Sequence, residues 1–372
     1  MFFCLGLAMT PIVPVAMAPR RAYAPRVKGA AVLFALLACI AASAGEAKRS
    51  PVTIRVMTQN LYLGTNLDAI VQAKSTHEAF SAVEQGWANV EANDFPTRAR
   101  AIAKEIAGAR PDFVGFQELS LYRTQTPPDF TVTPATMVAL DYAKELRKAL
   151  AARKLHYRFL AIGNETDAEL PSGDPPNMDI RLTIRDGLLV RVDKKIKIRR
   201  VRTGLYSTTT SLFGGFVTAK RGWVLADATV GGRTFRVVTT HLESFNDTSQ
   251  LAQGKELVAP GGPATTTLPT ILLGDLNSRA DGTGTPTHAN LLADGFKDAW
   301  LEAHPGDIGL TCCHGEDLRE VGGPFYSRID YVLMRNGFRA VAAGIVGEEP
   351  GDRLNGLWPS DHAGVWARLR LP

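Results

Sequence analysis

The stretch Ile271-Leu272-Leu273-Gly274-Asp275-Leu276-Asn277 joins an apolar run to an acid and an amide. A short apolar run is typical of a buried β-strand, so we expect the polar pair at its end. In extended backbone, residues two apart share a face, which places Asp275 beside Asn277 while Leu276 points into the core. The stretch therefore predicts a buried strand that presents a carboxylate and an amide to one ligand.

Five further polar motifs lie beside strand-like apolar runs elsewhere in the chain. In sequence order the whole series is Gln59-Asn60, Gln117-Glu118, Thr240-His241-Leu242, Gly274-Asp275-Leu276-Asn277, Arg328-Ile329-Asp330-Tyr331 and Ser360-Asp361-His362. Strands that end together at one edge of a sheet would bring these side chains to one mouth. Such a set suits a divalent cation, a water molecule to activate and an anionic phosphorus group to hold. The residues thus predict a metal-dependent phosphoesterase.

The composition is that of a folded globular chain. Of 372 residues, 45% are hydrophobic and 21% are charged, which supports a substantial core and argues against disorder. Strand-like runs alternate with a few helix-like segments, such as 97–109 and 135–154, and a loop is expected over 164–177. No repeat or low-complexity linker divides residues 45–372, so we expect one α/β domain with mixed sheets there.

The first 44 residues have the organisation of an export signal. An apolar run at 29–40, too short and too rich in Ala to span a bilayer, is followed by the cleavage pattern Ala42-Ser43-Ala44. The basic residues before it are Arg20, Arg21, Arg26 and Lys28. We expect cleavage after Ala44, with Met17 as an alternative start, and a secreted or periplasmic mature chain. The alternative is a lipoprotein anchored through Cys39, since Leu36-Leu37-Ala38-Cys39 resembles a lipidation box.

Removal of this signal changes the charge balance. The net charge of +5 falls to +1 because residues 1–44 hold four Lys or Arg and no Asp or Glu. A mature domain close to neutral gives no basic footprint for nucleic acid. The densest basic run, residues 191–202, fits a solvated edge strand protected by Lys and Arg, and a phosphate-binding edge is the alternative.

Two adjacent cysteines, Cys312 and Cys313, lie outside the signal. A vicinal disulfide and a pair of buried thiols both fit this spacing. Zinc binding by Cys312-Cys313-His314 would need scattered histidines to complete a tetrahedral set. We therefore interpret the pair as structural cysteines in a loop near the site.

The six motifs, taken in this order, make the chain similar to the endonuclease/exonuclease/phosphatase superfamily. That superfamily includes pancreatic-type deoxyribonuclease, abasic-site endonucleases, neutral sphingomyelinases and inositol-polyphosphate 5-phosphatases. Single motifs such as G-D-x-N occur by chance, but six in the correct order over about residues 53–370 are specific. The resemblance implies a four-layer α/β sandwich, deoxyribonuclease-I-like, with two packed mixed β-sheets flanked by helices. Tyr62 stands where abasic-site nucleases have a second acid after Asn60, which argues against a DNA-repair role.

By this resemblance the site side chains divide into two groups. The metal ligands would be Asn60, Glu118 and Asp361, holding Mg²⁺, with Mn²⁺ or Ca²⁺ as alternatives. The catalytic residues would be His241, Asp275, Asn277, Asp330 and His362. Asp275 would orient or deprotonate the attacking water, Asn277 would hold a phosphate oxygen, and Asp330 would orient His362.

The combined prediction is a secreted phosphodiesterase that hydrolyses a phosphate ester of nucleic acid or phospholipid by in-line attack of activated water. Two alternatives stay open. One is an inositol-phosphate-type phosphomonoesterase, which would need a strongly cationic pocket, and the other is a catalytically silent binding module of the same fold. We expect no obligate protein partner and no transmembrane span in the mature chain.

Overall fold

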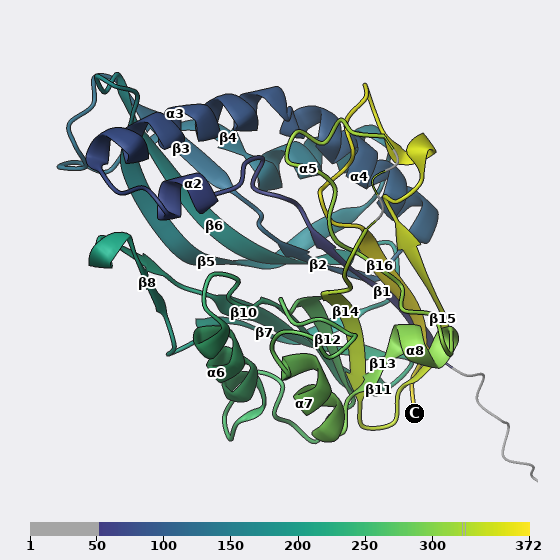
Figure 1. Cartoon of the computed structure of the whole chain (residues 1–372). Coiled ribbons are helices and arrows are strands. Elements are labelled where there is room, and N and C mark those ends of the chain that lie inside the picture. Colours follow the sequence, from purple (N-terminus) through teal and green to yellow (C-terminus); the bar gives the residue numbers. More distant parts are fainter. Residues whose placement is uncertain (1–51, 322, 324) are drawn as a thin grey trace, which may run out of the picture. The chain divides into compact units, whose positions relative to one another are not determined.

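Two β-sheets pack face to face in the computed structural model, which describes residues 52–321, 323 and 325–372 (Figure 1). Residues Pro51–Pro372 form one compact unit. The expected export signal at 1–44, the alternative start Met17 and the lipidation box at Cys39 lie outside the described residues. In the described part of the chain, no helix is both long and apolar enough to cross a membrane.

The larger sheet is built around the parallel pair β1 and β2. Its strand order is β15-β16-β1-β2-β6-β3-β4, β5 pairs with β6, and every neighbouring pair other than β1 and β2 is antiparallel. The strands are β1 (Thr53–Asn60), β2 (Phe113–Gln117), β3 (Leu121–Gln125), β4 (Met137–Asp141), β5 (Tyr157–Ser172), β6 (Met178–Arg191), β15 (Arg339–Val346) and β16 (Gly364–Arg370).

The smaller sheet is built around a second parallel pair, β11 and β12. Its order is β13-β14-β12-β11-β10-β7, and the other neighbours are antiparallel. Its strands are β7 (Lys197–Leu205), β10 (Gly222–Val230), β11 (Arg233–His241), β12 (Thr270–Asp275), β13 (Lys297–Asp298) and β14 (Asp330–Arg335). A short hairpin, β8 (Thr210–Leu212) and β9 (Val217–Ala219), pairs separately.

Helices cover the outer faces of both sheets (Figure 1). Those on the larger sheet are α2 (Asp68–Val71), α3 (Thr76–Ala92), α4 (Phe95–Ala109) and α5 (Tyr142–Ala152), and those on the smaller sheet are α6 (Asp247–Val258) and α7 (Thr287–Ala293). The short helix α8 (Ala299–Ala303) instead buries Ala299 and Trp300 in the apolar cluster between the sheets. Helix α4 buries Ala99, Ile102, Ala103 and Ile106, the three- and four-residue spacing that forms one apolar face. The side chain of Asp94 caps its first turn by accepting the N–H of Thr97.

Three apolar clusters fill the spaces between these layers. The cluster between the sheets contains Val56 of β1 and Ile271 of β12. A second joins the larger sheet to α4 and α5, and the third joins the smaller sheet to α6 and α7, through residues such as Leu257 and Leu291. The order of layers is helix, sheet, sheet, helix, so the predicted four-layer sandwich of two packed mixed sheets flanked by helices is confirmed.

Two local predictions are wrong. The helix expected over 135–154 begins only at Tyr142, because Met137–Asp141 pairs with β3 as strand β4. The loop expected over 164–177 is mostly strand, because β5 continues beside β6 to Ser172. In both places hydrogen bonding to a neighbouring strand overrides the local pattern.

The basic run at 191–202 leads into β7, which is the last strand at one side of the smaller sheet. Lys197, Arg199 and Arg200 are exposed along it. The interpretation of this run as a solvated edge strand is confirmed, and charged side chains there oppose edge-to-edge pairing with other chains.

Candidate active site

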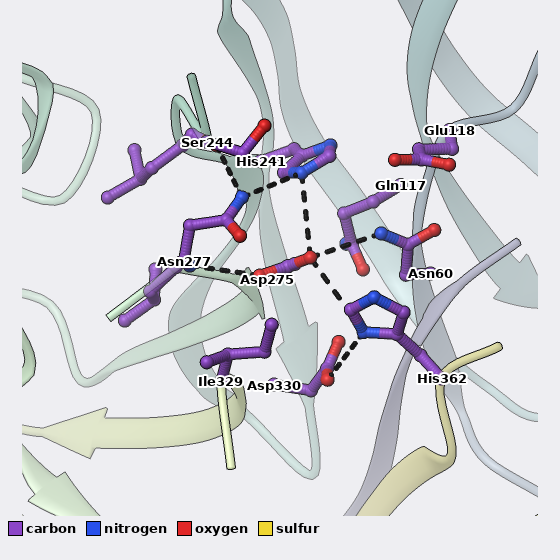
Figure 2. A network of polar contacts seen from close by, with 12 residues as sticks. Asn60, Gln117, Glu118, His241, Ser244, Asp275, Asn277, Ile329, Asp330 and His362 are labelled. Carbon is purple, nitrogen blue, oxygen red and sulfur yellow. Dashed lines mark hydrogen bonds and ion pairs between the residues drawn. The ribbon is translucent and has the colours of Figure 1, made fainter. Parts of the chain in front are cut away.

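Strand pairing brings polar strand ends to one edge of the two sheets. In the smaller sheet, His241 at the end of β11 lies opposite Asp275, and Asp275 lies opposite Asp330 at the start of β14. In the larger sheet, β1 ends at Asn60 in register with the last residue of β2, which immediately precedes Glu118. Asn60 Nδ2 donates to Asp275 Oδ2 at 3.1 Å, which joins the two sheets at this edge (Figure 2).

His362 forms an ion pair with a buried aspartate at the centre of the site. Its Nδ1 lies 2.9 Å from Asp330 Oδ2 and 3.8 Å from Asp275 Oδ2. Thr311 Oγ1 donates to the same Asp330 oxygen at 2.7 Å, which fixes the carboxylate. Burial alone lowers the pKa of His362, but Asp330 and Asp361 outweigh it and raise that pKa well above its ordinary value. His362 is therefore a positively charged donor at neutral pH.

Asp275 lies between the two imidazoles. Burial, and then the nearby charge of Asp330, raise the pKa of Asp275 to about 7. Its Oδ1 accepts the backbone N–H of Asn277 at 2.9 Å. A carboxylate that titrates near neutrality and is held on both oxygens is suited to general base chemistry at the working pH.

His241 has the opposite environment from His362. Arg221 Nη1 lies 3.0 Å from His241 Nδ1. Because a guanidinium can only donate, Nδ1 must accept and the proton of the ring is on Nε2. Burial, together with Arg221 and His362, lowers the pKa of His241 well below its ordinary value, so this imidazole is neutral. Its Nε2 lies 3.5 Å from Asp275 Oδ2.

Asn277 adds a second donor beside the His241 ring. Its Nδ2 donates to the carbonyl of Leu242 at 2.9 Å and lies 3.1 Å from His241 Nε2 (Figure 2). With the ring proton on Nε2, both groups carry N–H bonds in the same small region. Two convergent N–H groups can stabilise a developing negative charge on an oxygen atom.

Glu118 and Asp361 are the carboxylates best placed to hold a cation. Both are half-buried and line one cleft. Glu118 Oε2 accepts the backbone N–H of Leu63 at 2.7 Å. Burial and the neighbouring Asp361 raise the pKa of Glu118, and burial also raises that of Asp361. Two carboxylates that repel each other in this way fit a hard divalent cation between them, and the Asn60 side chain lies near Glu118 (Figure 2).

A tighter cluster of potential ligand atoms is formed by Asp275, Asp330 and His362, which lie within 4.8 Å of one another. Each member already has a hydrogen-bond partner: His362 Nδ1 is bonded to Asp330, and Asp275 accepts the side-chain amide of Asn60. A cluster joined in this way can position protons and charge, and Glu118 and Asp361 are two further carboxylates that could hold a cation.

The cleft has a volume of about 480 Å³ and an acidic lining. Arg221 is the one Lys or Arg among the described residues that line it. The acidic residues of the lining are Asp68, Glu118, Glu316 and Asp361. Without a bound cation, such a cleft would repel a phosphate anion.

Cys312 and Cys313 form a vicinal disulfide in a loop beside His362, and Cys313 Sγ lies 4.0 Å from His362 Nε2. The predicted position of the pair, in a loop near the site, is confirmed.

All eight predicted site residues thus lie along one edge of the sandwich or line its cleft. The sequence analysis missed Arg221 and Thr311, which position His241 and Asp330. Arg221 lies in the short connection between β9 and β10 and belongs to no strand-end motif, and Thr311 lies in a loop 19 residues before its partner. Neither position carries a local signal that periodicity could detect.

Comparison with known proteins agrees with this geometry. A family model described as the Endonuclease/Exonuclease/phosphatase family matches residues 57–362. No curated protein matches the chain. Among solved structures, the chain is similar to an endonuclease/exonuclease/phosphatase family protein from Bacteroides thetaiotaomicron, with a TM-score of 0.56 and 15% identity over 87% of this chain and 99% of that one.

Two further solved structures have the same fold. One is a mannosyl-6-phosphatase from Bacteroides thetaiotaomicron, with a TM-score of 0.53 and 16% identity over 85% of this chain and 99% of that one. The other is TDP2 from D. rerio, solved with a single-stranded DNA product, with a TM-score of 0.50 and 17% identity over 86% of this chain and 99% of that one. At identities of 15–17%, these similarities show a shared fold and nothing further.

Proposed function

Because the chain belongs to the endonuclease/exonuclease/phosphatase family, a family of hydrolases acting on phosphoric ester bonds, we propose that it is a metal-dependent phosphodiesterase. The observation that carries this proposal is the meeting of eight polar side chains, from Asn60 to His362, at one edge of the two sheets, where Glu118 and Asp361 line an acidic cleft. A silent binding module would have no need for a buried ion pair and a near-neutral carboxylate in the same place.

The residues that would hold the cation are Asn60, Glu118 and Asp361. Their donors are all oxygen atoms, which favours Mg²⁺, with Mn²⁺ and Ca²⁺ as alternatives. When bound, such an ion would neutralise charge on the phosphoryl group.

The protein residues around Asp275 divide the remaining work. Asp275 accepts the proton of the attacking water, and Asn60 holds its Oδ2 in place. The charged ring of His362 stabilises negative charge on a non-bridging oxygen, while Asp330 keeps that ring charged and oriented. His241 and Asn277 present neutral N–H donors to the same group.

The charge of the cleft favours a diester over a monoester. A phosphate diester carries one negative charge and a monoester carries about two at neutral pH. The described residues that line the cleft include four acids and one arginine, Arg221. Electrostatic repulsion by this lining is therefore smaller for the singly charged diester than for the monoester. An inositol-phosphate-type phosphomonoesterase would need a more cationic pocket.

A second cavity favours a diester that carries an apolar group. It has a volume of about 110 Å³ and lies under α3, with Val83, Gly86 and Trp87 on one wall. Alternate residues of β5 and β6, such as Leu170 and Leu182, form the opposite wall. It shares with the catalytic cleft the lining residues Thr65, Leu67, Ile184, Arg221 and Phe245.

An alkyl chain suits this cavity better than a nucleobase. The polar edges of a base would lose hydrogen bonds to water among aliphatic side chains, whereas a chain gains from leaving water. Of the two predicted substrate classes, we therefore favour the phospholipid over nucleic acid. Leu67, Trp87 and Phe213 are only half-buried around the cavity, which leaves apolar surface for the substrate to cover.

The primary test is hydrolysis of bis-p-nitrophenyl phosphate by the mature chain. We expect turnover with Mg²⁺, loss of turnover in EDTA and no turnover by Glu118→Gln. Absence of hydrolysis with Mg²⁺, Mn²⁺ and Ca²⁺ alike would favour the silent binding module.

Substrate class is tested with p-nitrophenyl alkyl phosphates from methyl to octyl, alongside sphingomyelin and plasmid DNA. We expect kcat/KM to rise by up to about four-fold for each methylene that enters the cavity. Gly86→Leu should flatten this rise, since a Cβ at Gly86 meets its nearest atoms at 3.5 Å and the added side chain would occupy the cavity. Gly108→Leu, in α4 with nothing within 4 Å of its Cβ, is the matched control. Plasmid nicking without a chain-length effect would select a nuclease.

The remaining proposals concern processing. We propose that residues 1–44 form an export signal and that 45–372 are a single catalytic domain, secreted or periplasmic. The compactness of Pro51–Pro372 supports this division. Mass spectrometry of the exported protein tests it: a first residue at Gly45 supports signal cleavage, and a lipid on Cys39 would show the lipoprotein alternative.

A further inference from the structure

A second group of carboxylates lies on β5, β6 and the loop before β4, far from the catalytic cleft. Its members are Asp129 in the loop between β3 and β4, Glu169 in β5 and Asp179 in β6. The carbonyl of Arg185 accepts the N–H of Leu119, which is next to Glu118. Asp179 is six residues from Arg185 along β6, roughly 20 Å at about 3.3 Å per residue.

The three side chains converge on one point. A ligand oxygen of each lies within 4.8 Å of the others. One oxygen of each carboxylate accepts a backbone N–H of the loop: Asp129 N–H donates to Asp179 at 2.7 Å, Thr133 N–H to Asp129 at 3.1 Å and Ala135 N–H to Glu169 at 2.8 Å. These bonds hold the carboxylates in fixed orientations.

The second oxygen of each carboxylate has no partner. Asp129 Oδ1, Glu169 Oε1 and Asp179 Oδ1 are buried and accept no hydrogen bond from the described residues. Asp179 is 0% exposed. Three buried acceptor oxygens left unsatisfied at one point are costly unless a group absent from the polypeptide binds them.

Within the described chain, none of the three carboxylates takes part in an ion pair with Lys, Arg or His. Arg181, on the same face of β6, is bonded to Asp167 at 2.9 and 2.6 Å and to the carbonyl of Ala135 at 3.3 Å. Burial raises the pKa of Glu169, and the charges of Asp179 and Asp129 raise it further, while the N–H of Ala135 and the charge of Arg181 offset only part of this rise.

We propose that Asp129, Glu169 and Asp179 bind a calcium ion that ties the loop between β3 and β4 to the hairpin of β5 and β6. Calcium accepts six to eight oxygen ligands at about 2.3–2.6 Å in flexible geometry, whereas zinc prefers nitrogen and sulfur. With three carboxylates, one from a loop and two from neighbouring strands, we expect an affinity of the order of 10⁻⁴ M, as in weak structural calcium sites.

The position of this site connects it to the apolar cavity. Side chains alternate along a strand, so Glu169 and Asp179 face away from Leu170 and Ile180, which line the cavity. The ion would therefore stabilise β5 and β6, which form one wall of the cavity, from the face opposite the cavity. The loop between β3 and β4 also contains Phe130 and Val132, which are 60% and 83% exposed, and the bound ion would hold this loop in place.

Calcium binding is tested by equilibrium dialysis with ⁴⁵Ca and by thermal unfolding of the mature chain after treatment with EDTA. Glu118→Gln is used as the parent protein so that the catalytic cleft does not contribute. We expect one bound ion and a rise in Tm of roughly 5 °C at a calcium concentration 100 times Kd.

Asp179→Asn in that parent should abolish both effects, and its Tm without calcium should equal or exceed that of the parent because one repelling charge is gone. Asp167→Asn, on the same face but paired with Arg181, is the matched control and should still bind. If Asp179→Asn does not fold, Glu169→Gln replaces it. A parent protein that binds no calcium, or an Asp179→Asn protein that binds as tightly as the parent, overturns the proposal.

Discussion

His362 and His241 are both buried and both face Asp275, yet they carry opposite charge states. His362 has Asp330 at 2.9 Å and becomes a stable cation. His241 has Arg221 at 3.0 Å and stays neutral, with its proton on Nε2. Burial alone would favour the neutral form of each ring. The comparison shows that the charge of the nearest partner, rather than depth, sets the chemistry of each imidazole.

Loss of the charged ring should have the largest effect. We expect His362→Ala to lower kcat by about 10³-fold or more, because it removes the cationic donor and leaves Asp330 unpaired. The measurement is turnover of bis-p-nitrophenyl phosphate with Mg²⁺. His288→Ala is the matched control, since His288 forms a similar buried pair with Asp298 at 3.1 Å outside the site. Normal kcat in His362→Ala would remove this residue from the mechanism.

Replacing the partner of the charged ring should have a smaller effect. Asp330→Asn keeps the ring of His362 but removes its main opposite charge, so the pKa of His362 should fall and kcat should drop by roughly 10²-fold. NMR titration of the ring reports the pKa, and steady-state kinetics reports kcat. Asp298→Asn should leave both unchanged. An unaltered His362 titration in Asp330→Asn would contradict the role assigned to this ion pair.

The neutral ring can be perturbed through its own partner. Arg221→Lys keeps a positive charge near the buried Glu243 but loses the planar fork that fixes His241 Nδ1. We expect kcat to fall about ten-fold with little change in KM, because only the orientation of one donor is lost. A loss confined to KM would show instead that Arg221 binds the substrate directly.

The smallest expected effect is a pH dependence of the free energy of unfolding, caused by Asp275, which lies between the two histidine rings. The pKa of Asp275 is about 7 in the folded chain and 3.8 in its ordinary state. Between these values the folded chain holds a proton that the unfolded chain has lost, so this group favours folding at low pH and its contribution is lost as pH rises through about 7. Thermal unfolding in EDTA should show this slope, and Asp275→Asn should flatten it.

The same titration predicts the pH profile of catalysis. As the proposed base, Asp275 must be ionised, so kcat/KM should rise through an apparent pKa near 7. A profile that stays flat from about pH 5 to pH 8 would transfer the base role to another group.

Most of the site could be predicted because its residues follow strands with clear apolar patterns. Asp275 comes directly after a run that is buried at every position, and Asp330 begins another such run. A strand end is a local property, and parallel pairing of β11 with β12 and of β1 with β2 then brings those ends together.

The features that were missed depend on tertiary contacts. Arg221 has a role only because the end of β11 and the segment that follows it place His241, Glu243 and Ser244 around it. Residues 137–141 have apolar spacing that fits a helix, and pairing with β3 makes them a strand. The calcium site likewise draws its acids from a loop and two strands, with no spacing that sequence alone could associate.

The register of the smaller sheet has one more consequence. His241, Asp275 and Asp330 are directly opposite one another across three adjacent strands. A slip of β12 by a single residue would turn Asp275 toward the interior and place Leu276 at the active-site edge of the sheet. Catalytic competence is therefore a readout of correct strand alignment: a misassembled sheet could keep its apolar packing and still be inert.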